Sequence, residues 1–152
     1  MHSCSFELNN QPMSAFKVSA LSVPAFSGQG LDVNKRSSAC LPGRGPIPPG
    51  RYYIFDRQGG GKLEWIRNLF RDRGDWFALY AMDGKLDDET YCKQLLRGQF
   101  RLHPKGPRGI SEGCITIDNL SDFYHVRALL KSRPATAVAG STLKAYGQVT
   151  VK

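Results

Sequence analysis

A histidine and a cysteine stand on either side of a short segment rich in glycine and proline, and they carry the chemistry that this sequence offers. His103 precedes the segment and Cys114 follows it. A thiol reacts as its thiolate, and a neighbouring imidazole can take the thiol proton and later return it. The pattern therefore predicts Cys114 as a nucleophile with His103 as its general base. A buried, inert cysteine beside a loop histidine is the alternative.

Side-chain alternation predicts that these two residues point to the same side of a sheet. Before the segment, the apolar phase holds Leu96, Phe100 and Leu102, and the other phase holds Gln99, Arg101 and His103. After it, the apolar phase holds Ile115 and Ile117, and the other holds Cys114, Thr116 and Asp118. Alternate residues of a strand face opposite sides, so the two strands present imidazole and thiol together if they are neighbours.

The residues around this pair have predicted roles that follow from their types. Gly113 permits a tight turn, so the backbone N–H groups of Gly113 and Cys114 are predicted to form an oxyanion hole. Ser111, which is short and polar, is predicted to orient the substrate or the histidine. Arg101 and Arg108 are predicted to attract substrate carboxylates, and a solvated basic surface is the alternative for both.

Other candidate residues add little chemistry to this pair. Tyr53 is predicted to line the cleft, although packing in the core is the alternative for it. The histidine, cysteine and acidic residues nowhere have the spacing of metal ligands, so neither a metal nor another cofactor is expected.

Length and composition predict one folded domain over residues 1–152. The chain has 152 residues, of which 41% are hydrophobic and 22% charged, and this composition excludes intrinsic disorder. Its formal net charge of +8 favours contact with a polyanion, and simple solubility is an equal alternative. The sequence shows neither an apolar stretch that could span a membrane nor the pattern of a secretory signal peptide at its start.

The four cysteines allow at most one disulfide if one of them is a catalytic thiol. They are Cys4, Cys40, Cys92 and Cys114, and no two of them form a Cys-x-x-Cys motif. Cys92 is expected in the core. Cys4 and Cys40 are free to pair in an oxidising compartment, but the spacing fixes no connectivity.

Hydrophobic patterns predict a mainly β, α+β chain with two short helices. Strands are expected over residues 3–8, 15–21, 23–26, 51–55, 76–82 and 141–151. Helices are expected over residues 62–74 and 121–132, with a helical turn at 87–90. A stretch rich in proline and glycine, residues 41–50, is expected to form a rigid loop within the domain.

Several segments together resemble one family of enzymes. A histidine at a strand end followed by Ser111-x-Gly113-Cys114 resembles the active-site signature of the YkuD-like L,D-transpeptidases. Residues 45–54 resemble the Pro-x-Gly-x-aromatic loop and strand of that family. Residues 25–28, 76–80 and 100–104 make the chain still more similar to the L,D-transpeptidase effectors of type VI secretion systems.

This resemblance implies a YkuD-like β-sandwich and an enzyme that acts on peptidoglycan. Cys114 would attack the diaminopimelate carbonyl of a tetrapeptide stem, release D-Ala and form a thioester. Water would then give a tripeptide by L,D-carboxypeptidase activity, or another D-amino acid would be exchanged in by L,D-transpeptidase activity. His103 would be the general base, and Ser111 and Gly113 occupy the matching motif positions.

The same resemblance implies partners and a place of action. The protein would be an antibacterial toxin, made in the producer cytoplasm without a signal peptide and acting in the periplasm of a target cell. Its partners would be peptidoglycan stem peptides, a cognate immunity protein and a spike or tube component of the secretion system. Neither nucleic acid nor stable membrane insertion is expected.

Two departures favour the effector branch over enzymes that make 3–3 crosslinks. Glu112 stands where typical L,D-transpeptidases have a second histidine, and Thr116 stands where they have asparagine or arginine. The stretch between His103 and Cys114 is also shorter than in the wall-building enzymes.

Two other functions remain as alternatives. A papain-like peptidoglycan amidase would use the same residue types, but those enzymes usually place the cysteine before the histidine, and here His103 comes first. A non-enzymatic basic module that binds cell wall or nucleic acid would suit the charge. The sequence lacks the usual nucleic-acid-binding motifs, and such a module predicts no effect of Cys114→Ser.

Overall fold

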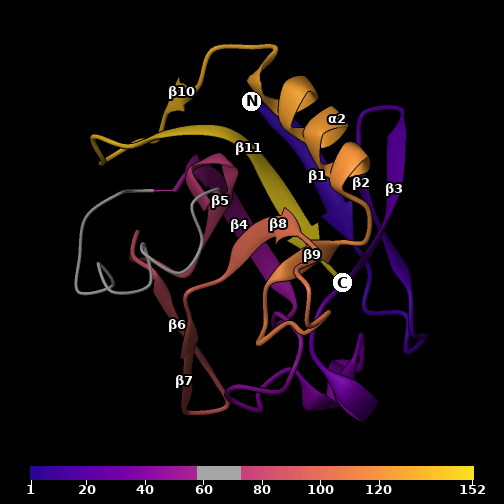
Figure 1. Cartoon of the computed structure of the whole chain (residues 1–152). Coiled ribbons are helices and arrows are strands. Elements are labelled where there is room, and N and C mark those ends of the chain that lie inside the picture. The colour runs from indigo at the N-terminus through magenta and orange to yellow at the C-terminus, as the bar shows by residue number, and fades with distance from the viewer. Residues whose placement is uncertain (58–72) are drawn as a thin grey trace.

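The computed structural model describes residues 1–57 and 73–152 (Figure 1). The N-terminal part contains β1 (His2–Phe6), β2 (Ser14–Val18), β3 (Leu21–Phe26) and β4 (Gly50–Asp56). The central part contains β5 (Phe77–Ala81), β6 (Glu89–Cys92), β7 (Leu95–Gly98), β8 (Arg101–Pro104) and β9 (Ile115–Ile117). The chain ends with α2 (Leu120–Lys131), β10 (Thr136–Ala137) and β11 (Lys144–Val151). Short 3₁₀ segments lie at Gly30–Asp32, Arg36–Ser38 and Arg73–Asp75.

Nine strands form one sheet that closes on itself. The order is β1-β2-β3-β9-β8-β5-β4-β11-β10, and β1 also pairs with β11. Both β1–β11 and β8–β9 are parallel pairs, whereas the other described pairs of this sheet are antiparallel. Closure leaves few strand edges exposed to other chains. Strands β6 and β7 form a separate hairpin that extends away from the closed sheet (Figure 1).

The core lies inside the closed sheet and under α2. Burial alternates along β11, so every second residue faces inward as a strand with one buried face requires. The buried face of α2 holds Phe123, Val126 and Leu130 and packs against β8, β9 and β11. Asn119 begins this helix, and its side-chain oxygen accepts a hydrogen bond from the Ser121 N–H. None of the described helices is long and apolar enough to cross a membrane.

Most predicted elements are confirmed, with one correction. The mainly β architecture is confirmed, and the helix expected over residues 121–132 is α2. The helical turn expected at 87–90 is wrong: Glu89–Cys92 is strand β6, because its backbone pairs with β7. The helix expected over 62–74 lies almost wholly outside the described residues.

The disulfide joins Cys40 to Cys92, a connectivity that the sequence left open, and the possible pairing of Cys4 with Cys40 is not formed. Cys4 lies on β1 as a free cysteine with its side chain in the core, 4% exposed. Cys92 is half-buried on β6 and not in the core. The bond therefore ties the β6–β7 hairpin to the loop before β4.

We expect the Cys40–Cys92 bond to stabilise the fold by restricting the unfolded chain. The two cysteines are 52 residues apart, so replacing both with serine is expected to lower the free energy of unfolding by about 2–4 kcal/mol. Urea denaturation measures the change, and the reduced wild-type protein should match the double variant. An unchanged midpoint in both samples would contradict a stabilising role.

Candidate active site

His103 and Cys114 lie on neighbouring parallel strands. His103 on β8 is paired in register with Thr116 on β9, and Cys114 lies two residues before Thr116 on the same face. Side chains two residues apart on a strand face the same side, so the Cys114 thiol and the His103 ring lie on one face of this pair. The neighbouring strands required by the sequence prediction are therefore present.

The His103 ring is held on two sides. Its Nδ1 atom is 2.7 Å from the Pro104 carbonyl oxygen, and because a carbonyl only accepts, Nδ1 carries the proton of this hydrogen bond. In the neutral ring Nε2 is therefore the basic nitrogen. Trp76 stacks on the ring, with centroids 4.2 Å apart and planes 18° from parallel. This arrangement fixes the tautomer and orientation that a general base needs.

Cys114 sits against the break between β7 and β8. Its thiol donates a weak hydrogen bond to the Gln99 carbonyl, at 3.9 Å, and its sulfur accepts one from the Arg101 backbone N–H. Desolvation raises the pKa of Cys114 to about 11; Glu112 and Asp88 add to the rise, and Arg101 opposes it. The resting residue is therefore a protonated thiol that needs a base to react.

Ser111 fixes the backbone at Cys114, the candidate nucleophile. Its side chain is buried, and its hydroxyl donates to the Cys114 carbonyl at 2.7 Å. The same oxygen accepts a hydrogen bond from the Gly28 N–H at 3.3 Å. Ser111 thus joins the cysteine loop to the segment after β3, and its hydroxyl is bonded to backbone groups and not to the imidazole.

Gly113 is required by both conformation and space. Its φ is 117°, a left-handed value that favours glycine. A Cβ there would lie 2.5 Å from Nη2 of Arg97 and 2.9 Å from Cε1 of Phe100. The backbone that is predicted to form the oxyanion hole therefore rests directly on a guanidinium and an aromatic ring.

The three predicted substrate-binding residues have different surroundings. The Arg101 guanidinium makes two hydrogen bonds to the Asp88 carboxylate, at 2.7 and 2.5 Å, and is largely buried. Arg108 is exposed in the loop between β8 and β9. Tyr53 packs near Phe55, and the strand registers place both on the same sheet face as Arg101. Their roles in substrate binding stay predictions.

The alternation predicted before His103 is wrong N-terminal to Phe100. Gln99 has a φ of 56°, which interrupts the strand between β7 and β8 and reverses the phase. Arg97 is consequently buried, 4% exposed, while Leu96 is 48% exposed. A left-handed non-glycine residue leaves no clear mark in the sequence, so the prediction missed Arg97.

Two further residues at the site have surroundings that the sequence did not predict. Trp76 was predicted only as a strand residue, because its stacking partner is distant in sequence. Thr116 is fully buried beside His103, and its hydroxyl has no partner within residues 1–57 and 73–152.

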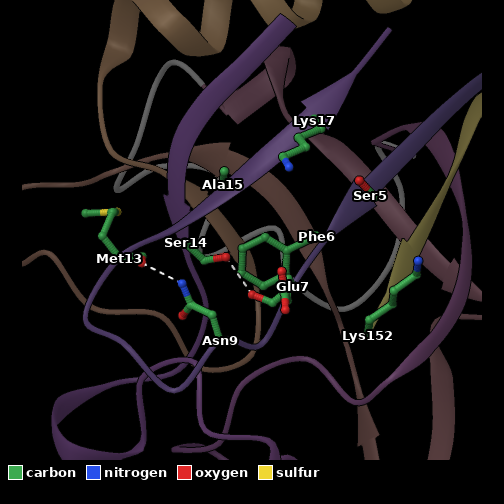
Figure 2. Close-up of a pocket in the computed structure, with 9 residues that line it drawn as sticks. All are labelled: Ser5, Phe6, Glu7, Asn9, Met13, Ser14, Ala15, Lys17 and Lys152. Carbon is green, nitrogen blue, oxygen red and sulfur yellow. Dashed lines mark hydrogen bonds between the residues drawn. The ribbon is translucent and has the colours of Figure 1, made fainter. Parts of the chain in front are cut away.

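The cavity in Figure 2 lies elsewhere. It has a volume of about 330 Å³ and is formed by β1, β2, the turn between them and Lys152. None of the candidate catalytic or substrate-binding residues lines it. In the described part of the chain, no group of three or more His, Cys, Asp or Glu residues is placed to hold a metal.

Comparison with known protein families identifies the family of the chain. A family model described as the Tlde1 domain matches residues 22–141. Neither the curated proteins nor the solved structures contain a match to the chain.

The raised pKa of Cys114 predicts how its reactivity depends on pH. We expect alkylation by iodoacetamide to accelerate about tenfold per pH unit from about pH 7 to about pH 10, because the thiolate fraction grows in that proportion. The rate should level off only near the pKa of about 11. Intact mass spectrometry follows the reaction, and Cys114→Ser reports the background from Cys4. A plateau near neutral pH would instead indicate a preformed thiolate–imidazolium pair.

The two hydrogen bonds of Ser111 predict a stability cost for its removal. Ser111→Ala leaves the buried Gly28 N–H and Cys114 carbonyl without this partner, so we expect a loss of about 1–3 kcal/mol in unfolding free energy. Chemical denaturation measures it. Ser22→Ala, at an exposed position of β3, is the matched control and should leave the midpoint unchanged. Equal midpoints for the two variants would exclude the anchoring role.

Proposed function

Because the chain belongs to the Tlde1 family of type VI secretion effectors, we propose that it attacks the tetrapeptide stems of peptidoglycan with Cys114 as its nucleophile. The family implies a secreted antibacterial effector with peptidoglycan-modifying activity. The observation that supports the finer proposal is the placement of His103 and Cys114 on one face of the parallel β8–β9 pair.

The first half of the proposed reaction forms a thioester. His103 Nε2 takes the Cys114 proton as the sulfur attacks the diaminopimelate carbonyl, and negative charge develops on the carbonyl oxygen. The backbone N–H groups of Gly113 and Cys114 are the proposed donors to that oxygen. The imidazolium then protonates the departing D-Ala amine as the peptide bond breaks, which leaves the shortened stem on the sulfur.

The second half decides between two products. If water attacks the thioester, His103 takes a water proton, and a tripeptide with a free carboxylate leaves as the thiol is restored. If the amine of another D-amino acid attacks, the same steps give an exchanged tetrapeptide. The protein would thus act as an L,D-carboxypeptidase, an L,D-transpeptidase or both, depending on the access of water to the thioester.

The remaining parts of the proposal concern partners and place. An effector that damages peptidoglycan requires an immunity protein in the producer, and peptidoglycan is its substrate. We further propose delivery by a spike or tube component and action in the target periplasm. We also propose that this closed sheet corresponds to the YkuD-like β-sandwich that the resemblance implies.

The decisive experiment is mass analysis of tetrapeptide muropeptides incubated with the protein, with and without added D-Met. Without D-Met, we expect the tetrapeptide to lose D-Ala. With D-Met, we expect D-Met to replace D-Ala. Cys114→Ser and His103→Ala should each lower the rate roughly 10³-fold or more, because each removes a member of the reacting pair.

Controls separate a missing activity from a damaged protein. Cys4→Ala removes the other free thiol and should keep the activity. The assay omits strong reductant, because the Cys40–Cys92 bond is part of the folded protein. An unchanged tetrapeptide with folded protein would refute the proposal, and cleavage at another stem bond would favour the amidase.

A further inference from the structure

Arg97 is a buried cation whose hydrogen bonds, among the described residues, go to backbone carbonyls. Its guanidinium donates hydrogen bonds to the carbonyl oxygens of Ala39 and Pro46, of Gly45 at 3.1 Å and of Glu112 at 3.5 Å. It also lies 5.5 Å from the centre of the Phe100 ring. These contacts join β7 to the loop before β4 and to the loop that carries the nucleophile.

This guanidinium is not neutralised by a carboxylate in the described part of the chain. The ion pairs there involve other cations, and Arg97 forms none of them. Carbonyl dipoles satisfy its N–H groups but leave its full positive charge in place. Burial lowers the pKa of Arg97, although arginine stays protonated at physiological pH. A buried, unneutralised cation favours negative charge on nearby groups.

The group best placed to carry that charge is Cys114. The guanidinium contacts the backbone of Gly113 and bonds to the Glu112 carbonyl, so it lies directly beside the residues that precede the sulfur. Cys114 and Tyr52 are the two groups whose negative forms would oppose the lowering of the Arg97 pKa. Tyr52 is buried and donates its phenolic proton to the Pro48 carbonyl, which leaves Cys114 as the group that ionises during the reaction.

We propose that Arg97 is a positioning residue, which holds the Glu112–Gly113–Cys114 backbone in place and stabilises the negative charge that forms at Cys114. The inference rests on the proposed function for its catalytic consequence, but its effect on the thiol does not need a substrate. Other charged or titratable groups around the sulfur are His103, Arg101, Asp88 and Glu112. All of them are retained when Arg97 alone is replaced.

Two variants separate the charge of Arg97 from its shape. Arg97→Met keeps a long side chain and removes the charge, and Arg97→Lys keeps the charge and loses the planar fork of donors. We expect Arg97→Met to move the alkylation profile of Cys114 about one unit to higher pH, which is about a tenfold slower reaction at a fixed pH below the plateau. Arg97→Lys should retain most of the wild-type profile. Turnover of muropeptides should fall at least about tenfold in Arg97→Met and be partly rescued in Arg97→Lys.

The matched control is Arg51→Met, an arginine on the exposed side of β4 that bonds to Gln148. It should leave the alkylation profile unchanged. If Arg97→Met does not fold, Arg97→Gln takes its place, with the same expected shift. A folded neutral variant with the wild-type profile would overturn the proposal, and so would equal displacement in the neutral and lysine variants. If the wild-type protein does not act on muropeptides, the proposed function is refuted. The alkylation profile of Cys114 would still decide the role of Arg97.

Discussion

The parallel pairing of β8 with β9 is the constraint on which the candidate site depends. The register sets His103 beside Thr116, and Cys114 lies two residues before Thr116 on the same face. Parallel neighbouring strands usually need a long connection, because the chain must return from the end of one strand to the start of the next. Strands β8 and β9 are paired over only three residues, so the return path is short and the loop of residues 105–114 suffices. The Lys105 N–H bonds to the Ile117 carbonyl and continues the pairing into that loop. A shift by one residue would move the thiol to the core face.

The loop before β4 is the second support, and three kinds of bond hold it. The disulfide fixes Cys40 to β6, and Arg97 on β7 donates hydrogen bonds to the carbonyl groups of Ala39 and Gly45. The Ser27 hydroxyl accepts a hydrogen bond from the Ile47 N–H in the interior. These bonds stabilise a loop whose prolines have no backbone N–H to donate and whose glycines are conformationally permissive. Arg97 also bonds to the Glu112 carbonyl and so links this loop to the segment that carries Cys114.

The two free cysteines lie in different environments. Cys4 is enclosed by the core, and desolvation alone raises its pKa to about 12. Cys114 keeps some exposure and lies among groups of both charges, including Arg101 and Glu112. Its thiol is protonated at rest, so the proposed reaction needs a base, and His103, stacked on Trp76 and bonded to Pro104, is the candidate for that role. The same side chain is thus inert in one place and a candidate nucleophile in another.

The sequence by itself determined most strands, helix α2 and the candidate pair, because alternation, helical periodicity and the types of His103 and Cys114 are local properties. Only the tertiary structure decided which cysteines pair, since that depends on how two distant loops meet. It also decided the reversed phase at Gln99, where one left-handed backbone angle turns Arg97 inward and Leu96 outward. The closure of the sheet through β1 and β11 and the stacking of Trp76 on His103 have the same origin. Each of these features joins residues that are far apart in the chain. It therefore depends on how the whole chain packs, which local sequence patterns do not specify.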